Sequence, residues 1–95
     1  MHPVSMSPSA DYASLSIRDA HGKPLDELDG LWYVDKYRFK ERQNHIYIAQ
    51  GQHSVGYQCP GWTSWDDFAS VVYRFEAGKS YEVVCEEKGP VINPL

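Results

Sequence analysis

The chain has 95 residues, with 13 acidic against 9 basic side chains, a net charge of −4 and 42% hydrophobic residues. This length predicts one domain, and the apolar content suffices for a packed core, which excludes a chain that is disordered throughout. The acidic balance argues against nucleic-acid binding, which normally shows a basic patch, and no apolar run approaches the ~18–20 residues of a membrane span.

The first segment of the chain has no periodic apolar pattern. It carries Pro3, Pro8 and several serines. Such a composition predicts a flexible N-terminal tether over residues 1–12. The rest, residues 13–95, is expected to form a single β domain.

Strand signals begin directly after this segment. Residues 14–19 alternate, with Leu15 and Ile17 on one face. A turn-rich stretch follows over 20–30. Residues 31–40 are then rich in aromatic and β-branched side chains, which favour strands. The residues expected on a shared face are Leu31, Tyr33, Tyr37 and Phe39.

Residues 44–59 predict a β-hairpin. If Gln50 and Gly51 form a two-residue turn, Ile48 pairs with His53 across it. The apolar residues of both arms then lie on one face. The expected inward residues are Ile46, Ile48, Val55, Tyr57 and Cys59.

Residues 70–86 predict a second hairpin, with a three-residue loop centred on Gly78. Val91 and Ile92 predict a short edge strand, limited by the prolines on both sides. The inward residues of this hairpin are Val71, Tyr73, Phe75, Tyr81, Val83 and Cys85. The predicted fold is all-β, a small antiparallel β-sandwich or partly open barrel of about six or seven strands.

Each hairpin ends in an inward-facing cysteine. A disulfide between Cys59 and Cys85 would close a loop of 26 residues and stabilise the fold by roughly 3–4 kcal/mol. Such a bond implies an oxidising compartment. The alternative is two buried free thiols in a cytoplasmic protein.

The segment 60–68 holds the first candidate binding site. Trp62, Trp65, Asp66 and Asp67 combine aromatic faces with carboxylates, a composition suited to stacking a sugar or gripping a peptide. The alternative is a lid, in which tryptophan plugs the open end of the core. We expect Trp62 to cap the core and Trp65 to be exposed.

A second candidate surface is a stripe of alternating bases, here named the cationic stripe. It consists of Lys36, Arg38, Lys40 and Arg42. The stripe predicts either an edge strand kept soluble by its charges or a docking face for an acidic partner or polyanion.

Catalytic and metal signals are weak. No nucleophile elbow, phosphate-binding loop or zinc-ligand spacing occurs. His45 is expected to face outward, whereas His53 is expected to face inward as a half-buried side chain with a hydrogen-bond partner. The two therefore could not share a metal, and we predict no catalytic residue, metal or cofactor.

The phrases "IYIAQGQHSVGYQC" and "YRFEAGKSYEVVCE" resemble strand-turn-strand phrases of small β-domains in bacterial envelope lipoproteins, and more broadly PEGA-like and transthyretin-like sandwiches. The resemblance covers residues 13–87. The chain departs from that pattern at Gln50, where such families commonly have proline, and in its Trp-rich segment. The resemblance implies a non-catalytic domain and carries over no functional residue.

The expected function is therefore a binding or protein-interaction module of the bacterial cell envelope, which docks a protein partner or a glycan. It would work in the periplasm or tethered to the outer membrane, touching the membrane only through an N-terminal lipid anchor, as a monomer or weak dimer. One alternative is an inhibitor or immunity-type protein that blocks an enzyme. A small hydrolase is the other, and a cytoplasmic protein with free thiols is the alternative for location.

Overall fold

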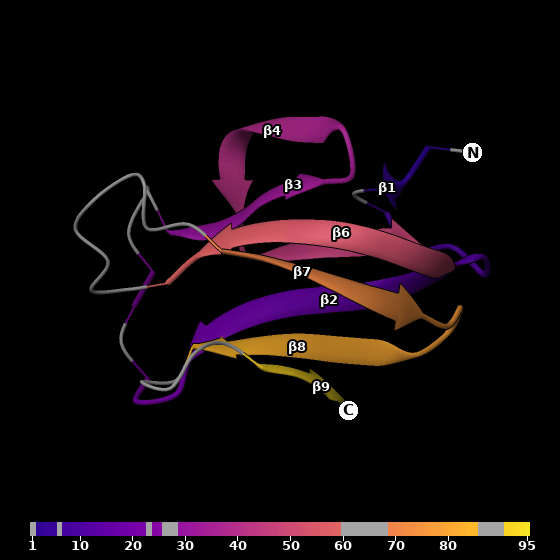
Figure 1. Cartoon of the computed structure of the whole chain (residues 1–95). Helices are drawn as coiled ribbons and strands as arrows, with labels where there is room; N and C mark the ends of the chain where they lie inside the picture. The colour runs from indigo at the N-terminus through magenta and orange to yellow at the C-terminus, as the bar shows by residue number, and fades with distance from the viewer. Residues whose placement is uncertain (1, 6, 23, 26–28, 60–68, 86–90) are drawn as a thin grey trace.

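The computed structural model describes residues 2–5, 7–22, 24–25, 29–59, 69–85 and 91–95. These residues form nine strands in two sheets that pack face to face as an open sandwich (Figure 1), which confirms the predicted fold class. They include no helix that could cross a membrane. The strands are β1 (Val4–Ser5), β2 (Tyr12–Asp19), β3 (Gly30–Val34), β4 (Tyr37–Gln43), β5 (His45–Ala49), β6 (Gly51–Gln58), β7 (Ala69–Phe75), β8 (Ser80–Cys85) and β9 (Val91–Pro94).

The two sheets differ in strand number and order. The five-stranded sheet has the order β1-β5-β2-β8-β9, and the four-stranded sheet has the order β4-β3-β6-β7. Most neighbours are antiparallel, but β2 and β8 run parallel. β4 and β9 are both edge strands, as the charge pattern and the prolines predicted.

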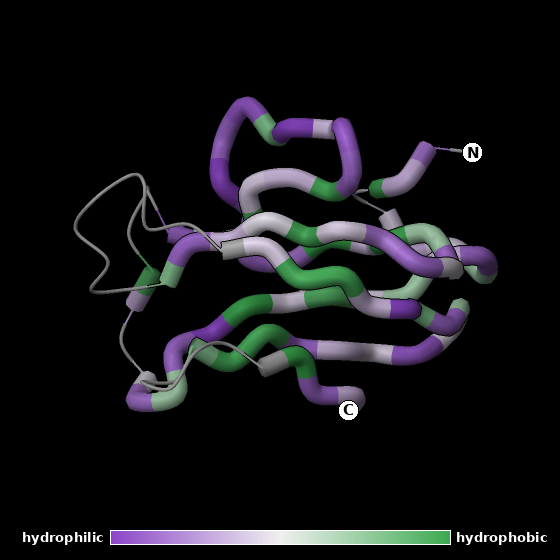
Figure 2. The backbone as a smooth tube through the Cα atoms, in the orientation of Figure 1, coloured by the Kyte–Doolittle hydropathy of each residue, from purple (hydrophilic) through white to green (hydrophobic). Residues whose placement is uncertain are grey.

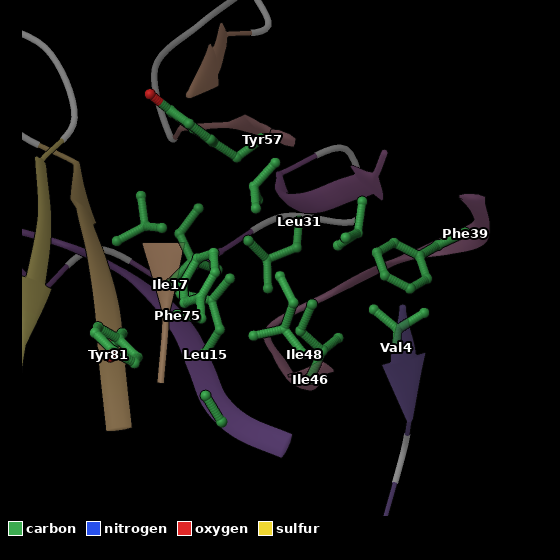
Figure 3. Packing of buried hydrophobic residues seen from close by; sticks show 14 of the residues in the cluster. Val4, Leu15, Ile17, Leu31, Phe39, Ile46, Ile48, Tyr57, Phe75 and Tyr81 are labelled. Atoms are coloured by element: carbon green, nitrogen blue, oxygen red, sulfur yellow. The ribbon is translucent and has the colours of Figure 1, made fainter. Parts of the chain in front are cut away.

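The core lies between the sheets and draws side chains from both (Figure 3). Leu15, Ile46 and Ile48 come from the five-stranded sheet, whereas Leu31 and Phe75 come from the four-stranded sheet, and all five are at most 1% exposed. Burying a side chain of this size contributes about 1.5–3 kcal/mol, so these residues hold the two layers together.

The two predicted hairpins are wrong, because each turn carries the chain from one sheet to the other. β5 pairs with β1 and β2, whereas β6 pairs with β3 and β7. Gly51 has a φ of 115°, a conformation that glycine adopts readily. The turn around Gly78 likewise separates β7 from β8. The inward faces are nevertheless as predicted, because Ile46, Ile48 and Val55 are fully buried.

The predicted tether over residues 1–12 is wrong for its described strand residues. Val4 and Ser5 form β1, which pairs with Ile48 and Tyr47 of β5, and Val4 is only 6% exposed. Figure 3 shows Val4 beside Phe39 of β4. The segment therefore closes one side of the core, because it covers apolar surface that would otherwise meet water.

Cys59 and Cys85 form a disulfide, as predicted, with a Cα–Cα distance of 5.7 Å. Cys59 follows β6 of the four-stranded sheet, and Cys85 ends β8 of the five-stranded sheet. The bond therefore links the two layers covalently. A disulfide is compatible with an oxidising compartment.

Candidate functional site

The residues first expected to bind, Trp62, Trp65, Asp66 and Asp67, lie in the segment 60–68, outside the residues that the structure describes. Among the described residues, the candidate site consists of the second predicted surface, the cationic stripe, and the residues around it.

An open cleft of about 540 Å³ lies beside the β3–β4 turn. It is lined by Tyr33, Asp35, Lys36, Arg38 and Ser54, and we call it the Tyr33 cleft. Figure 1 shows β4 rising away from β3 and β6, and Figure 2 shows that β4 is largely hydrophilic. The cleft therefore sits where a charged edge strand meets the outer face of the four-stranded sheet.

Tyr33 covers Gly56, its direct neighbour on β6. A Cβ atom at position 56 would collide with the Tyr33 ring, 2.7 Å from its Cζ atom and still closer to Cδ2 and Cε2. Glycine inside a strand often marks such a close approach. Because Val55 and Tyr57 point into the core, Gly56 faces outward, and the Tyr33 ring lies over the outer surface of the sheet.

This placement of Tyr33 corrects the expectation that it shares a face with Leu31. The pairing of β3 with β4 and with β6 shifts register between these two residues. A bulge inserts an extra residue and so reverses the facing of those that follow. Leu31 consequently stays in the core, while Tyr33 becomes part of the cleft. The same expectation is wrong for Tyr37, which is 40% exposed at the start of β4.

Asp35 anchors the β3–β4 turn at the edge of the cleft. Its φ is 54°, in the left-handed region that aspartate tolerates better than most residues. Its Oδ1 accepts a hydrogen bond from the Ser54 backbone N–H at 3.0 Å, and its Oδ2 lies 2.6 Å from His53 Nδ1. The carboxylate thus joins the turn to β6.

His53 is half-buried and holds partners on both ring nitrogens, as expected for its position. Nδ1 faces the Asp35 carboxylate, and Nε2 lies 2.8 Å from the Ala49 carbonyl oxygen. Both ring nitrogens of His53 are therefore engaged within the fold. The ring bridges β6 to the end of β5 and contacts the Asp35 carboxylate.

The surroundings of Asp35 shift its pKa. Burial raises the pKa of Asp35. Hydrogen bonds from the Ser54 backbone and His53, together with the charge on His53, lower it by more than burial raises it, so the pKa lies below its ordinary value of 3.8. The ionised carboxylate therefore stabilises the folded state.

We expect Asp35→Asn to lower the free energy of unfolding by about 0.5–1 kcal/mol at pH 5.5. Asparagine keeps the left-handed turn but loses the charged hydrogen bonds, whose contribution is reduced by solvent screening because the side chain is 40% exposed. The folded pKa of Asp35 lies below its unfolded value, so this contribution is present above about pH 4 and is lost as the pH falls through the folded pKa. Urea unfolding of the wild-type protein and the variant between pH 3 and 5.5 measures the difference in their free energy of unfolding. A difference that stays constant to pH 3 would contradict the assignment.

The cationic stripe continues from the cleft along β4. The Arg42 guanidinium lies 4.2 Å from the centre of the Trp32 ring, and that of Arg38 lies 5.5 Å from it. Burial lowers the pKa of Arg42, and the charge on Arg38 lowers it further. Its Nε is buried and makes no hydrogen bond within the described residues. The stripe thus holds two guanidinium groups close enough to repel each other.

Within the described residues, the stripe makes no ion pair. Arg18 pairs with Glu82, and Lys79 pairs with Glu76, but no carboxylate of a described residue lies within 4.0 Å of the four stripe cations. Arg74 on β7 also has no acidic partner among the residues that the structure describes, but it lies on another strand, apart from the stripe. The stripe is therefore a local concentration of positive charge on a chain whose net charge is −4.

Two arrangements resemble parts of a hydrolytic site. Ser14 Oγ lies 2.6 Å from His45 Nε2 at the surface of the five-stranded sheet. Among the described residues no carboxylate bonds to the other ring nitrogen of His45, so the third member of a triad is missing there. His53 has its carboxylate, but both of its nitrogens are occupied. No group of three or more metal-binding side chains occurs in the described part of the chain.

Sequence reasoning found the stripe but missed the Tyr33 cleft. The stripe follows from simple alternation along one segment. The cleft depends on a bulge in β3 and on the pairing of Tyr33 with Gly56, which are 23 residues apart in the numbering. A glycine within the otherwise strand-like run 51–58 was the one available signal.

Comparison with known proteins found no match: no family model, no curated protein and no solved structure is similar to the chain.

Proposed function

We propose that this chain is a non-catalytic binding module of the bacterial cell envelope, which docks a glycan or a protein partner through the Tyr33 cleft and the cationic stripe. The observation that carries the proposal is the set of four cations that have no acidic partner within the described residues, beside an open aromatic cleft. Positive charge without internal compensation is available to an external anion.

The fixed geometry of the cleft supports the proposal that the cations bind a ligand and do not only prevent edge-to-edge association of β4. An exposed cation that only prevents edge-to-edge association needs no fixed surroundings. Here the β3–β4 turn is held by Asp35 and His53, and the Tyr33 ring is seated over a glycine. A rigid site lowers the entropy lost on binding, so these supports favour recognition.

The absence of a complete catalytic set in the described residues motivates the non-catalytic part of the proposal. The Ser14–His45 pair has no orienting acid there, and His53 has no free nitrogen to act as a base. The disulfide supports the envelope location, because the bacterial periplasm is an oxidising compartment.

Capture from a bacterial envelope extract tests the proposal. Immobilised wild-type protein should retain a protein or glycan that is lost when Lys36→Glu and Arg38→Glu are combined. The variant Arg74→Glu is the matched control, since Arg74 is an exposed base on β7, outside the stripe. It should retain the same material.

The segment 60–68 offers the rival site. If the combination of Trp62→Ala and Trp65→Ala abolishes capture while the stripe variant keeps it, the proposed surface is wrong. Equal capture by all variants would also reject the proposal. Circular dichroism of each variant checks that the fold survives.

A further inference from the structure

The chemistry of the Tyr33 cleft narrows the ligand class, on the condition that the proposed binding function holds. Lys36 and Arg38 line the cleft, and Lys40 and Arg42 continue the positive charge along β4. Lys36 lies in the turn before β4, and the other three bases lie on β4 itself, so the stripe presents several positive charges rather than a single point. An array of this kind fits a ligand that repeats its negative charge.

The Tyr33 ring indicates a second property of the ligand, beyond its negative charge. It lies over Gly56 on the outer surface of the sheet and forms part of the cleft wall. Binding sites that combine one aromatic face with a few polar groups suit ligands with an apolar ring face and polar edges. Saccharide rings have this shape, whereas an extended acidic side chain does not.

Asp35 distinguishes the two remaining ligand classes, which are acidic peptides and acidic saccharides. Its carboxylate lines the same cleft as the two cations, with its side chain 40% exposed. Glutamate and aspartate side chains carry only acceptors and would be repelled by Asp35. Sugar hydroxyl groups can donate to Asp35 and exchange hydrogen bonds with the Ser54 hydroxyl, while a sugar carboxylate meets Lys36 or Arg38.

We infer that the Tyr33 cleft and the cationic stripe bind an acidic polysaccharide built from carboxylate-bearing sugar rings. One ring lies against Tyr33 with its hydroxyl groups toward Asp35 and Ser54, and the carboxylates of successive rings follow the bases of β4. An acidic peptide is the competing macromolecule, and the test below distinguishes the two.

The experiment is calorimetric titration of the full chain with three probes of graded chemistry. The first is a short oligogalacturonate, which has rings, hydroxyl groups and carboxylates. The second is its methyl ester, which keeps the rings and loses the charge. The third is a polyglutamate peptide, which keeps the charge and loses the rings. We expect the first to bind roughly tenfold or more tightly than either of the others, and its affinity to fall as salt is raised.

Variants locate the binding. Tyr33→Leu and Arg38→Gln should each weaken oligogalacturonate binding roughly tenfold, as expected for central contacts. Arg74→Gln, which removes the same charge outside the stripe, should change it less than about twofold. Because Arg38 is exposed, Arg38→Gln tests the charge even if Tyr33→Leu unfolds the protein.

The outcomes separate this inference from the function on which it rests. If polyglutamate binds as tightly as oligogalacturonate in an Arg38-dependent way, the saccharide class is overturned while a binding role at the stripe stands. Binding of the ester equal to that of the acid would overturn the charge requirement. If no probe binds but envelope capture depends on Arg38, the inference alone falls. If capture is also independent of Arg38, both fall.

Discussion

Replacing both cysteines, Cys59→Ala with Cys85→Ala, should lower the free energy of unfolding by about 3–4 kcal/mol. The bond closes a loop of 26 residues and links strands from different sheets, so its loss frees the unfolded chain and leaves the layers joined only by packing. A domain of this size has a small core, and the loss would be a large part of its stability. Urea unfolding of both proteins measures the change.

Reductant provides the matched control for this prediction. Wild-type protein unfolded in the presence of reductant should approach the stability of the double variant, whereas the variant itself should not respond. Thiol titration of denatured, unreduced wild-type protein should find no free thiol. Finding two thiols would contradict the disulfide and remove its support for an oxidising compartment.

Removal of residues 1–5 should lower the free energy of unfolding by about 2–4 kcal/mol. Val4 is 6% exposed and packs in the core cluster with Phe39, and the Pro3 carbonyl accepts a hydrogen bond from the Ala49 N–H at 2.9 Å. Without β1, that apolar surface and the outer edge of β5 would face water.

A pair of point variants separates burial from chain shortening. Val4→Ala should lower the free energy of unfolding by about 1–2 kcal/mol, whereas Ser7→Ala, at an exposed position, should leave it nearly unchanged. An unchanged thermal midpoint for the shortened chain would show that β1 contributes nothing and would restore the interpretation of this segment as a tether.

The sequence was sufficient to predict the layers of this fold but not the path of the chain between them. Ile46, Ile48 and Val55 alternate with polar residues on either side of Gly51. Alternation places these residues inward whether the two strands lie side by side in one sheet or face each other across the core. Only strand pairing distinguishes the two cases, so the inward faces were right and the hairpins were wrong.

The same limit explains the errors around β1 and Tyr33. A two-residue strand such as Val4–Ser5 has no period to detect, and its burial depends on Phe39, far along the chain. The bulge after Leu31 turns Tyr33 to the outer face of the sheet. A bulge cannot be detected from the alternation of polar and apolar residues in the sequence. The inward cysteines, the edge position of β4 and the hydrogen-bonded His53 depended on local pattern, and these expectations were confirmed.

Hydrogen–deuterium exchange tests the location of the binding surface most directly. It compares the free protein with the protein bound to the envelope material that it captures. We expect slower exchange in the segments 33–38 and 52–56, which form the Tyr33 cleft and its floor, and little change in β8 and β9 of the other sheet. Slower exchange confined to residues 60–68, with none at the Tyr33 cleft, would contradict the account and move the binding site to the tryptophan-bearing segment.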